Sequence, residues 1–248
     1  MKSVIQIGKR IGWDNAYIDL DIKKPSSGDK AAGIKYSQFN ADLCEEIIKE
    51  WSNEGDIIVD PFAGWGTRAV VTETLGRRYE GYEISPSTYN RITQHIEGLG
   101  LTPKIILGDG VVMEGTPNDY ANMILTCPPY HKLEYYEITP KQLTAIPKYK
   151  DFIIKIDECI QNCFRVLKED GYACWVVGDF RSEHRWGGFV NYHGDVISGF
   201  KKAGFKHWDT IILHNPSPLT PIVESNSAKW KYSAKVHEYL LVFKKVIL

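Results

Sequence analysis

Several features that would mark a specialised class of protein are scarce or missing in this sequence. It has only five cysteines, an odd number without Cys-x-x-Cys spacing, so neither a disulfide framework nor a zinc site of paired cysteines is expected. It lacks a run of the roughly 18 apolar residues that a membrane span needs, and no apolar stretch of signal-peptide length stands near residue 1. These absences predict a soluble cytoplasmic protein that needs no metal.

An excess of one charge is also missing. The chain has 30 Lys and Arg against 31 Asp and Glu, a net charge of −1, so it lacks the basic field of a protein that coats nucleic acid. Contact with nucleic acid would have to come from local patches. The 248 residues are 43% hydrophobic and 25% charged, which is close to the globular average. One domain with a sizeable core is expected, and two small domains are the alternative.

From residue 36 onward, short β-branched runs alternate with longer amphipathic stretches. This pattern is typical of a parallel sheet covered by helices. Helices are expected over residues 41–52, 67–75, 151–168 and 191–203, and from Ser85-Pro86 onward. Seven strands are expected, at residues 56–60, 79–83, 104–107, 123–126, 172–177, 210–213 and 236–243. Residues 1–34 are interpreted as a loosely structured leader, and residues 35–248 as a single domain.

A glycine-containing loop joins the first of these strands to a helix. It reads Asp60-Pro61-Phe62-Ala63-Gly64-Trp65-Gly66-Thr67, and its glycines would let the backbone approach a ligand at the helix N-terminus. Glu83 follows about 20 residues later, where dinucleotide-binding folds carry a ribose-binding carboxylate. Asp109 ends the next strand. Two carboxylates at successive strand ends suit an adenosine, with a NAD site and a turn that serves only packing as alternatives.

The most informative segment is Thr126-Cys127-Pro128-Pro129-Tyr130, directly after an apolar strand. Consecutive prolines cannot continue a sheet ladder, so they hold the backbone rigid and leave carbonyls pointing out of the strand end. Such carbonyls can accept hydrogen bonds from an exocyclic amine, whose lone pair is otherwise delocalised into its ring. Tyr130 supplies a flat face for stacking a base. The segment therefore predicts chemistry on the amino group of a base, with an ordinary Pro-Pro turn as the alternative.

Together these segments resemble the class I S-adenosylmethionine (SAM) methyltransferases that modify amino groups in DNA. Residues 60–67 resemble their D-P-F-x-G-x-G-T motif, and residues 126–136 are similar to the T-S-P-P-Y-x-x-L-x-x-Y form of phage and bacterial DNA methylases. Residues 35–39 and 237–245 resemble the segments that open and close that domain, so the resemblance covers about 35–245. It implies an α/β fold with a seven-stranded, Rossmann-like, mostly parallel sheet and an antiparallel C-terminal strand. It also implies DNA methylation of the kind found in restriction-modification systems.

The resemblance assigns roles to individual residues. Catalysis would rest on Cys127, Pro128, Pro129 and Tyr130. In the SAM site, Glu83 would hold the ribose hydroxyls and Asp109 the adenine, and the full set is Tyr36, Gln38, Asp60, Phe62, Ala63, Gly64, Gly66, Thr67, Glu83, Asp109 and Gly110. Loops 131–150 and 214–235 interleave basic with aromatic residues, which suits phosphate contact and stacking. The target-binding residues expected are His131, Tyr135, Tyr136, Arg181 and Trp230.

Cys127 is a departure from the family, which has Asp, Asn or Ser at this position. A thiol is a weak acceptor, and its similarity to Ser slightly favours cytosine N4 over adenine N6 as the target. A nucleophilic role of the cytosine-C5 kind is the minor alternative for Cys127. For the whole chain, the alternatives are an RNA or protein-glutamine methylase with the same Pro-Pro-Tyr chemistry, a NAD-dependent oxidoreductase and an inactive SAM-binding module.

No separate target-recognition domain fits between the motifs. We therefore expect weak, salt-sensitive DNA binding through loops, with loose specificity, help from a second copy or a partner subunit, or both. The target base would have to be flipped out of a duplex or lie in a single strand.

Overall fold

The computed structural model describes residues 1–7, 39–132, 141–181, 188–214, 231–233 and 235–247. The strands of its main sheet are β1 (Val4–Gln6), β2 (Ile57–Asp60), β3 (Arg78–Glu83), β4 (Lys104–Leu107), β5 (Ala121–Thr126), β6 (Leu167–Val177), β9 (Lys206–His214) and β10 (His237–Lys244). The helices are α3 (Ala41–Trp51), α4 (Thr67–Thr74), α5 (Pro86–Gly98), α6 (Tyr149–Val166) and α7 (Tyr192–Ala203), with a 3₁₀ turn η1 (Leu143–Ala145). A small separate sheet pairs β7 (Phe180–Arg181) with β8 (Phe189–Val190).

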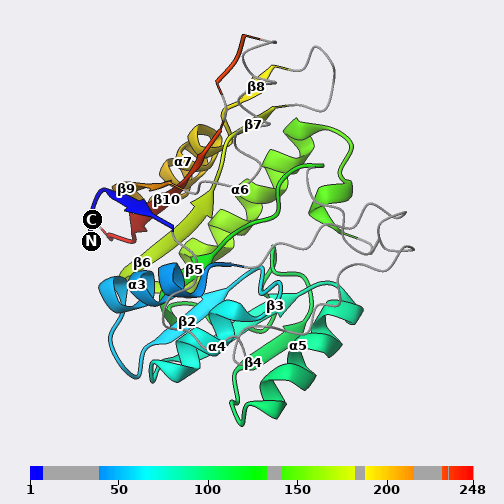
Figure 1. Ribbon diagram of the computed structural model, residues 1–248, viewed down its shortest axis with the longest axis vertical. Coiled ribbons are helices and arrows are strands. Elements are labelled where there is room, and N and C mark those ends of the chain that lie inside the picture. The colour runs from blue at the N-terminus through cyan, green and yellow to red at the C-terminus, as the bar shows by residue number, and fades with distance from the viewer. Residues whose placement is uncertain (8–38, 133–140, 182–187, 215–230, 234, 248) are drawn as a thin grey trace.

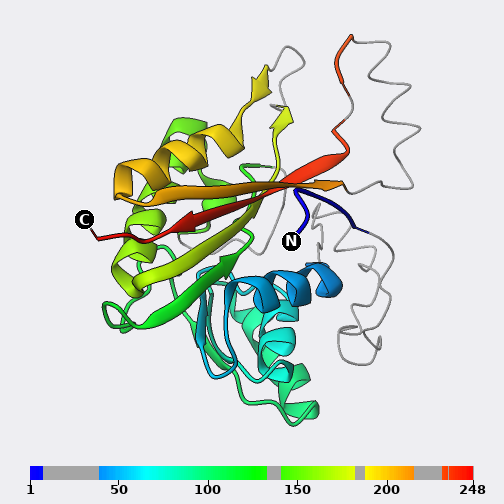
Figure 2. The same cartoon turned by 90° about the vertical axis from the view of Figure 1, so that its left-hand side faces the viewer.

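The main sheet has eight strands in the order β1-β9-β10-β6-β5-β2-β3-β4. Strand β10 runs antiparallel to both of its neighbours, and all other pairs are parallel. Helices α6 and α7 pack on one face, and α3, α4 and α5 on the other (Figure 1 and Figure 2). This arrangement confirms the mostly parallel α/β fold with an antiparallel C-terminal strand.

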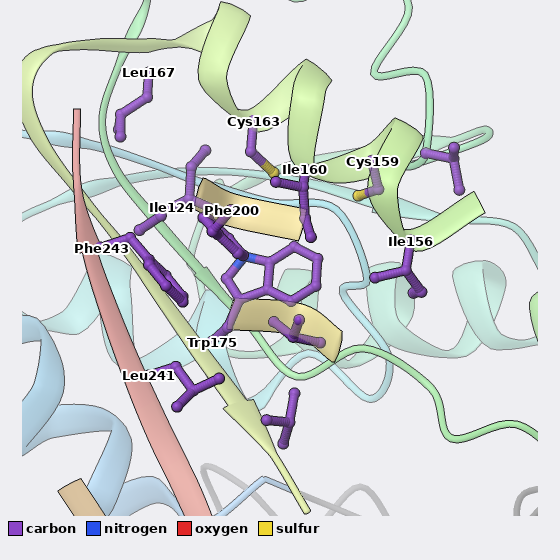
Figure 3. Packing of buried hydrophobic residues seen from close by; sticks show 14 of the residues in the cluster. Ile124, Ile156, Cys159, Ile160, Cys163, Leu167, Trp175, Phe200, Leu241 and Phe243 are labelled. Atoms are coloured by element: carbon purple, nitrogen blue, oxygen red, sulfur yellow. The ribbon is translucent and has the colours of Figure 1, made fainter. Parts of the chain in front are cut away.

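Trp175 of β6 lies in the middle of the core on the α6 and α7 face (Figure 3). Its ring meets the edge of Phe200 at 5.1 Å between centroids, and Phe200 stacks on Phe243 of β10 at 3.8 Å. Side chains of α6 close the other side of Trp175. Full burial of such aromatic residues stabilises the fold by about 1.5–3 kcal/mol each, and it fixes β6 and β10 relative to each other.

Two helices begin where their capping residues predict. Asn40 Oδ1 accepts a hydrogen bond from Leu43 N at 2.8 Å and starts α3. The Ser85 hydroxyl accepts from Thr88 N, and Pro86 stands at the first position of α5. Each cap satisfies an N–H group that has no partner within the helix.

The seven predicted strands all form, and the structure adds elements that the patterns did not predict. Val4–Gln6, inside the predicted leader, form β1 and pair with residues 212–214 of β9. Residues 8–38 lie outside the described part, so the leader and the boundary at residue 35 stay predictions. Strand β6 begins at Leu167 rather than at 172, and it contains an irregularity: Asp170 has a positive φ of +62°, and the register against β5 shifts between Ala121 and Met123.

Within the described ranges, no helix is both long and apolar enough to cross a membrane. The same residues contain no group of three or more His, Cys, Asp or Glu side chains placed to bind a metal ion. All five cysteines are free thiols, and four of them are buried.

Candidate functional site

A pocket of ≈ 260 Å³ lies at the carboxyl ends of the parallel strands. Open α/β sheets bind ligands at this edge. The loops after β2, β3, β4 and β5 all contribute to its wall, together with the start of β10. Of the residues expected at a cofactor or catalytic site, those that line the pocket are Phe62, Ala63, Gly64, Thr67, Glu83, Asp109, Gly110, Cys127, Pro128, Pro129 and Tyr130.

The two glycines of the loop after β2 have different tasks. Both have positive φ, +56° at Gly64 and +80° at Gly66, a conformation that favours glycine. Gly64 lines the pocket, and a Cβ built there would meet nothing closer than a carbonyl oxygen at 3.8 Å. Gly66 faces away from the pocket toward α5, where a Cβ would lie 2.7 Å from Ile92 Cγ2. Gly66 therefore permits helix packing instead of lining the pocket as the motif predicted.

Asp60, at the end of β2, is fully buried and does not line the pocket. Its Oδ1 accepts hydrogen bonds from Phe62 N at 3.0 Å and from the Thr126 hydroxyl at 2.6 Å. Its Oδ2 accepts from Arg68 Nε at 2.6 Å and from the Tyr79 hydroxyl at 2.7 Å. Four donors of this protein therefore hold a carboxylate that the motif assigned to the cofactor, and Asp60 joins β2, β3, α4 and the end of β5.

Arg68 of α4 is the cation that balances Asp60. Burial lowers the pKa of its guanidinium, but the charge of Asp60, its hydrogen bond and the nearby Tyr79 and Cys127 together outweigh burial, and the net shift of the pKa is upward. The guanidinium also lies 5.0 Å from the centroid of the Phe39 ring, and both residues line the pocket. The pair is buried on both sides, so removing either partner would leave an uncompensated charge.

Glu83, at the end of the neighbouring strand β3, has the opposite environment. Its carboxylate lines the pocket, and its Oε1 accepts a hydrogen bond from Ser85 N at 2.8 Å. Burial raises its pKa to about 7, while hydrogen bonds from the backbone of Ser85, Gly64 and Ile84 work in the other direction. A carboxylate held in a pocket with little solvent can accept strong hydrogen bonds from the hydroxyl groups of a ligand.

The loop after β4 brings Asp109 and Gly110 to the pocket. Asp109 Oδ1 accepts Val111 N at 3.0 Å, and its Oδ2 lies 3.4 Å from Lys141 Nζ. A Cβ at Gly110 would stand 1.7 Å from the Pro61 carbonyl oxygen, so only glycine lets the loops after β2 and β4 touch here. Both Pro61 and Gly110 line the pocket.

The Cys-Pro-Pro-Tyr segment follows β5, at the opposite end of the pocket from Asp109 and Glu83 along the strand order. Thr126 fastens the end of β5 to Asp60, and the rigid prolines then carry Cys127 and Tyr130 to the pocket wall. The Tyr130 hydroxyl donates to Glu238 Oε1 at 2.8 Å, and its ring meets Phe180 and Tyr192 edge-on at 6.2 and 6.0 Å. Burial, followed by the Glu238 charge, raises the Tyr130 pKa well above its usual value.

Of the residues expected to bind the target, the structure describes His131 and Arg181, and neither lines the pocket. His131 does not line it, because its ring lies against Tyr149 and Phe152 and its Nε2 meets the Ile146 carbonyl at 2.8 Å. Arg181 lies on β7, with its guanidinium 4.3 Å from the centroid of the Tyr232 ring. The expected residues Tyr36, Gln38, Tyr135, Tyr136 and Trp230 lie outside the described residues.

Several pocket residues escaped sequence reasoning. Glu238, on the antiparallel strand, carries the clearest missed signal: a carboxylate at the start of the apolar run 239–243. Because β10 runs antiparallel, its first residues lie at the carboxyl edge of the parallel strands, where a charged residue faces the ligand site. Lys141 belongs to the loop 131–150, whose basic residues were expected to contact the target, and it lines the pocket beside Asp109. Other missed lining residues are Phe39, Leu43, Trp65, Arg68 and Thr88.

The pocket fits a cofactor that contains a nucleoside. Glu83 offers a carboxylate to hydroxyl groups, Gly64 leaves its backbone open, and Asp109 has a side chain that is only 20% exposed. The fold and this edge of the sheet define a class I methyltransferase-type α/β protein. A SAM-dependent methyltransferase structure from Methanosarcina mazei has the same fold, with TM-score 0.58 and 12% identity over 82% of this chain and 98% of that one.

The N6_N4_Mtase family of DNA methylases matches residues 13–94 and 121–246, and the chain belongs to this family. The family resemblance drawn from the motifs is thereby confirmed, and the match begins inside the predicted leader. The Type II methyltransferase M.BamHI of Bacillus amyloliquefaciens is 42% identical over 72 residues, 29% of this chain and 15% of that protein. The orphan methyltransferase M.BamHII of the same organism is 36% identical over 85 residues, which are 34% of this chain and 32% of that protein. The chain thus spans about a third or less of the length of these relatives.

Proposed function

We propose that this protein is a SAM-dependent methyltransferase that acts on an exocyclic amino group in DNA, N4 of cytosine or N6 of adenine. Membership of the DNA methylase family supports this proposal, as do two relatives that are named methyltransferases. The observation that carries it is one pocket that holds both Glu83 with Gly64 and the segment 127–130.

In this proposal the two ends of the pocket have separate tasks. When bound, SAM supplies a methyl group on a positively charged sulfur, and transfer to the amine yields a neutral thioether and one released proton. Glu83 accepts from ribose hydroxyls, and Asp109 accepts from the adenine amine. The backbone carbonyls near Pro128 and Pro129 hold hydrogens of the target amine, and Tyr130 stacks on its base. The enzyme then contributes mainly by positioning, with acceptors arranged before the reaction.

DNA contact would involve the β7–β8 pair and residues 231–235. Arg181 lies over Tyr232, and Lys235 Nζ is 4.6 Å from the centroid of Phe189, which is exposed. Basic side chains beside exposed aromatic rings suit phosphates and unstacked bases. The substrate would be single-stranded or have its base flipped out, and a second copy or partner subunit would assist. Five free thiols support a reducing compartment such as the cytoplasm.

The test is incubation with methyl-labelled SAM and DNA, with RNA and a protein mixture in parallel, followed by digestion and mass spectrometry. Labelled N4-methyldeoxycytidine or N6-methyldeoxyadenosine is expected, and a Tyr130→Ala variant that still binds SAM should produce neither. If the label appeared only in RNA or only in protein glutamine, that molecule would be the substrate instead of DNA. No label in any arm would contradict the proposal.

A substitution of Cys127 distinguishes an active enzyme from an inactive SAM-binding protein. Its side chain is half-buried and lines the pocket, where the family carries Asp, Asn or Ser. We expect Cys127→Ser to change the rate of an already measurable reaction only modestly, since serine has similar size and the backbone acceptors remain. A large gain from near zero would identify the natural chain as the inactive module. The comparison needs equal SAM affinity in both proteins.

A further inference from the structure

Glu238 reaches the catalytic segment from a distant part of the chain. The strand order places β6 between β5, which leads into Tyr130, and β10, which begins with His237 and Glu238. The hydrogen bond from the Tyr130 hydroxyl to Glu238 Oε1, 2.8 Å long, therefore spans the end of the intervening strand. Both residues line the same pocket.

Gly178 makes room for this bond. It follows the last residue of β6, and a Cβ built on it would lie 3.2 Å from the Tyr130 hydroxyl oxygen and 3.3 Å from Glu238 Cγ. Both distances are tighter than ordinary van der Waals contacts, so a side chain here would displace the pair. The absence of a side chain at Gly178 therefore leaves the space that the hydrogen bond between Tyr130 and Glu238 needs.

Tyr130 is held at the sides of its ring by aromatic contacts and at its tip by the hydroxyl group. Phe180 and Tyr192 meet the ring edge-on, with centroids 6.2 and 6.0 Å away. The hydroxyl oxygen lies on the Cβ–Cγ axis, so an anchor there fixes the direction of that axis and restrains rotation about χ1, while the edge-on contacts with Phe180 and Tyr192 restrain rotation about χ2. Hydrogen bonds to a carboxylate are about twice as strong as bonds between neutral groups.

We propose that Glu238 is a positioning residue, which holds the Tyr130 side chain in place for stacking on the target base through a hydrogen bond that Gly178 admits. This inference rests on the proposed function of Tyr130. A pre-oriented ring helps only when the base is presented for reaction, so its loss lowers turnover more than SAM binding. Glu238 acts through Tyr130 and need not touch the reacting atoms.

A double-mutant cycle tests this role by kinetics. Glu238→Ala and Tyr130→Phe should each lower kcat about tenfold or more, the effect of one hydrogen bond to a charged group, and the KM for SAM should stay within about twofold. The double variant should be no slower than the slower single variant, because both changes remove the same bond. Glu238→Gln, which keeps an acceptor, should recover most of the rate. Full kcat in Glu238→Ala, or multiplicative losses in the double variant, would overturn the role.

A second measurement needs no catalysis, so it separates this inference from the proposed function. The chain has 14 tyrosines, and labelling them with ¹³C at Cζ gives one NMR signal each. The Tyr130 signal, assigned by its loss in Tyr130→Phe, should move in Glu238→Ala and also in Gly178→Ala, and less in Glu238→Gln. An unmoved signal in the two alanine variants would refute the bond. If Glu238→Ala does not fold, the result for Gly178→Ala decides alone, since this variant keeps Glu238 in the chain and only disturbs its hydrogen bond to Tyr130.

Discussion

Asp60 and Glu83 end two adjacent strands, β2 and β3, yet their surroundings differ in kind. Asp60 is fully buried, and its two oxygens accept four hydrogen bonds from the protein. Glu83 faces the pocket, and burial raises its pKa to about 7. The Asp60 carboxylate is bound on both oxygens by side-chain and backbone donors that join several elements, whereas the Glu83 carboxylate accepts from neighbouring backbone groups and lines the pocket, where a ligand can reach it. The following predictions test whether Asp60 serves the fold and Glu83 serves the cofactor site.

The largest effect is expected for Asp60→Ala. Arg68 would then be a buried cation without its carboxylate, and the Tyr79 and Thr126 hydroxyls would lose an acceptor. Breaking a buried pair in this way costs about 3–5 kcal/mol of unfolding free energy. Urea unfolding measures it, with Glu83→Ala as the matched control at the next strand end. A loss below about 1 kcal/mol for Asp60→Ala would show that Asp60 does not organise the fold.

The second effect is the reverse behaviour of Glu83→Ala. Two hydroxyl donors would lose a charged acceptor, so calorimetry should show SAM affinity lower by at least about tenfold. Its unfolding free energy should change by less than about 1 kcal/mol or rise, because the folded protein no longer has to bury this carboxylate. A lower unfolding free energy together with unchanged SAM affinity would show that Glu83, like Asp60, serves the fold and not the cofactor.

The third effect is on pH dependence. The Glu83 pKa is raised from 4.5 in the unfolded chain to about 7. Between these values the folded protein holds a proton that the unfolded chain has lost, so the contribution of Glu83 to stability falls as pH rises from about 4.5 to 7, and then levels off. SAM affinity should instead increase from pH 6 to pH 8 as the carboxylate forms. Glu83→Gln should abolish both trends relative to wild type, and identical pH profiles would refute the assignment.

The smallest effect is expected at the third acidic strand end. Lys141 is 69% exposed, and its Nζ lies 3.4 Å from Asp109 Oδ2. Exposed ion pairs contribute about 0–1 kcal/mol. Lys141→Met should therefore leave both the urea midpoint and SAM affinity nearly unchanged, the affinity within about threefold. A tenfold change in SAM affinity would place Lys141 among the cofactor-binding residues.

Much of the fold could be predicted because its signals are local. Apolar runs bounded by turns indicated the seven strands, and Asn40 and Ser85 marked helix starts. The strands β1, β7 and β8 are only two or three residues long, too short for a periodicity to register. Their existence depends on partners elsewhere in the chain, such as β9 for β1.

The site was harder to predict because its roles depend on long-range contacts. The motif could not reveal that Asp60 is saturated, since two of its donors come from Tyr79 and Thr126 on other strands. Nor could it show that Gly66 is required by Ile92 of the following helix. By contrast, the segment 127–130 lines the pocket, and its place at the strand end is a local feature, because two prolines after a strand determine the backbone geometry there.

Strand β1 also has a consequence for how copies of this chain behave beside each other. It covers residues 212–214 of β9, and Ile7 N extends the pairing to the His214 carbonyl at 2.8 Å. Without this cover, the last residues of β9 would present unpaired N–H and C=O groups at the margin of the sheet. Such margins template pairing between molecules. Along this part of the sheet the outermost strand is therefore only three residues long, and short edge strands are one of the ways in which proteins limit such pairing.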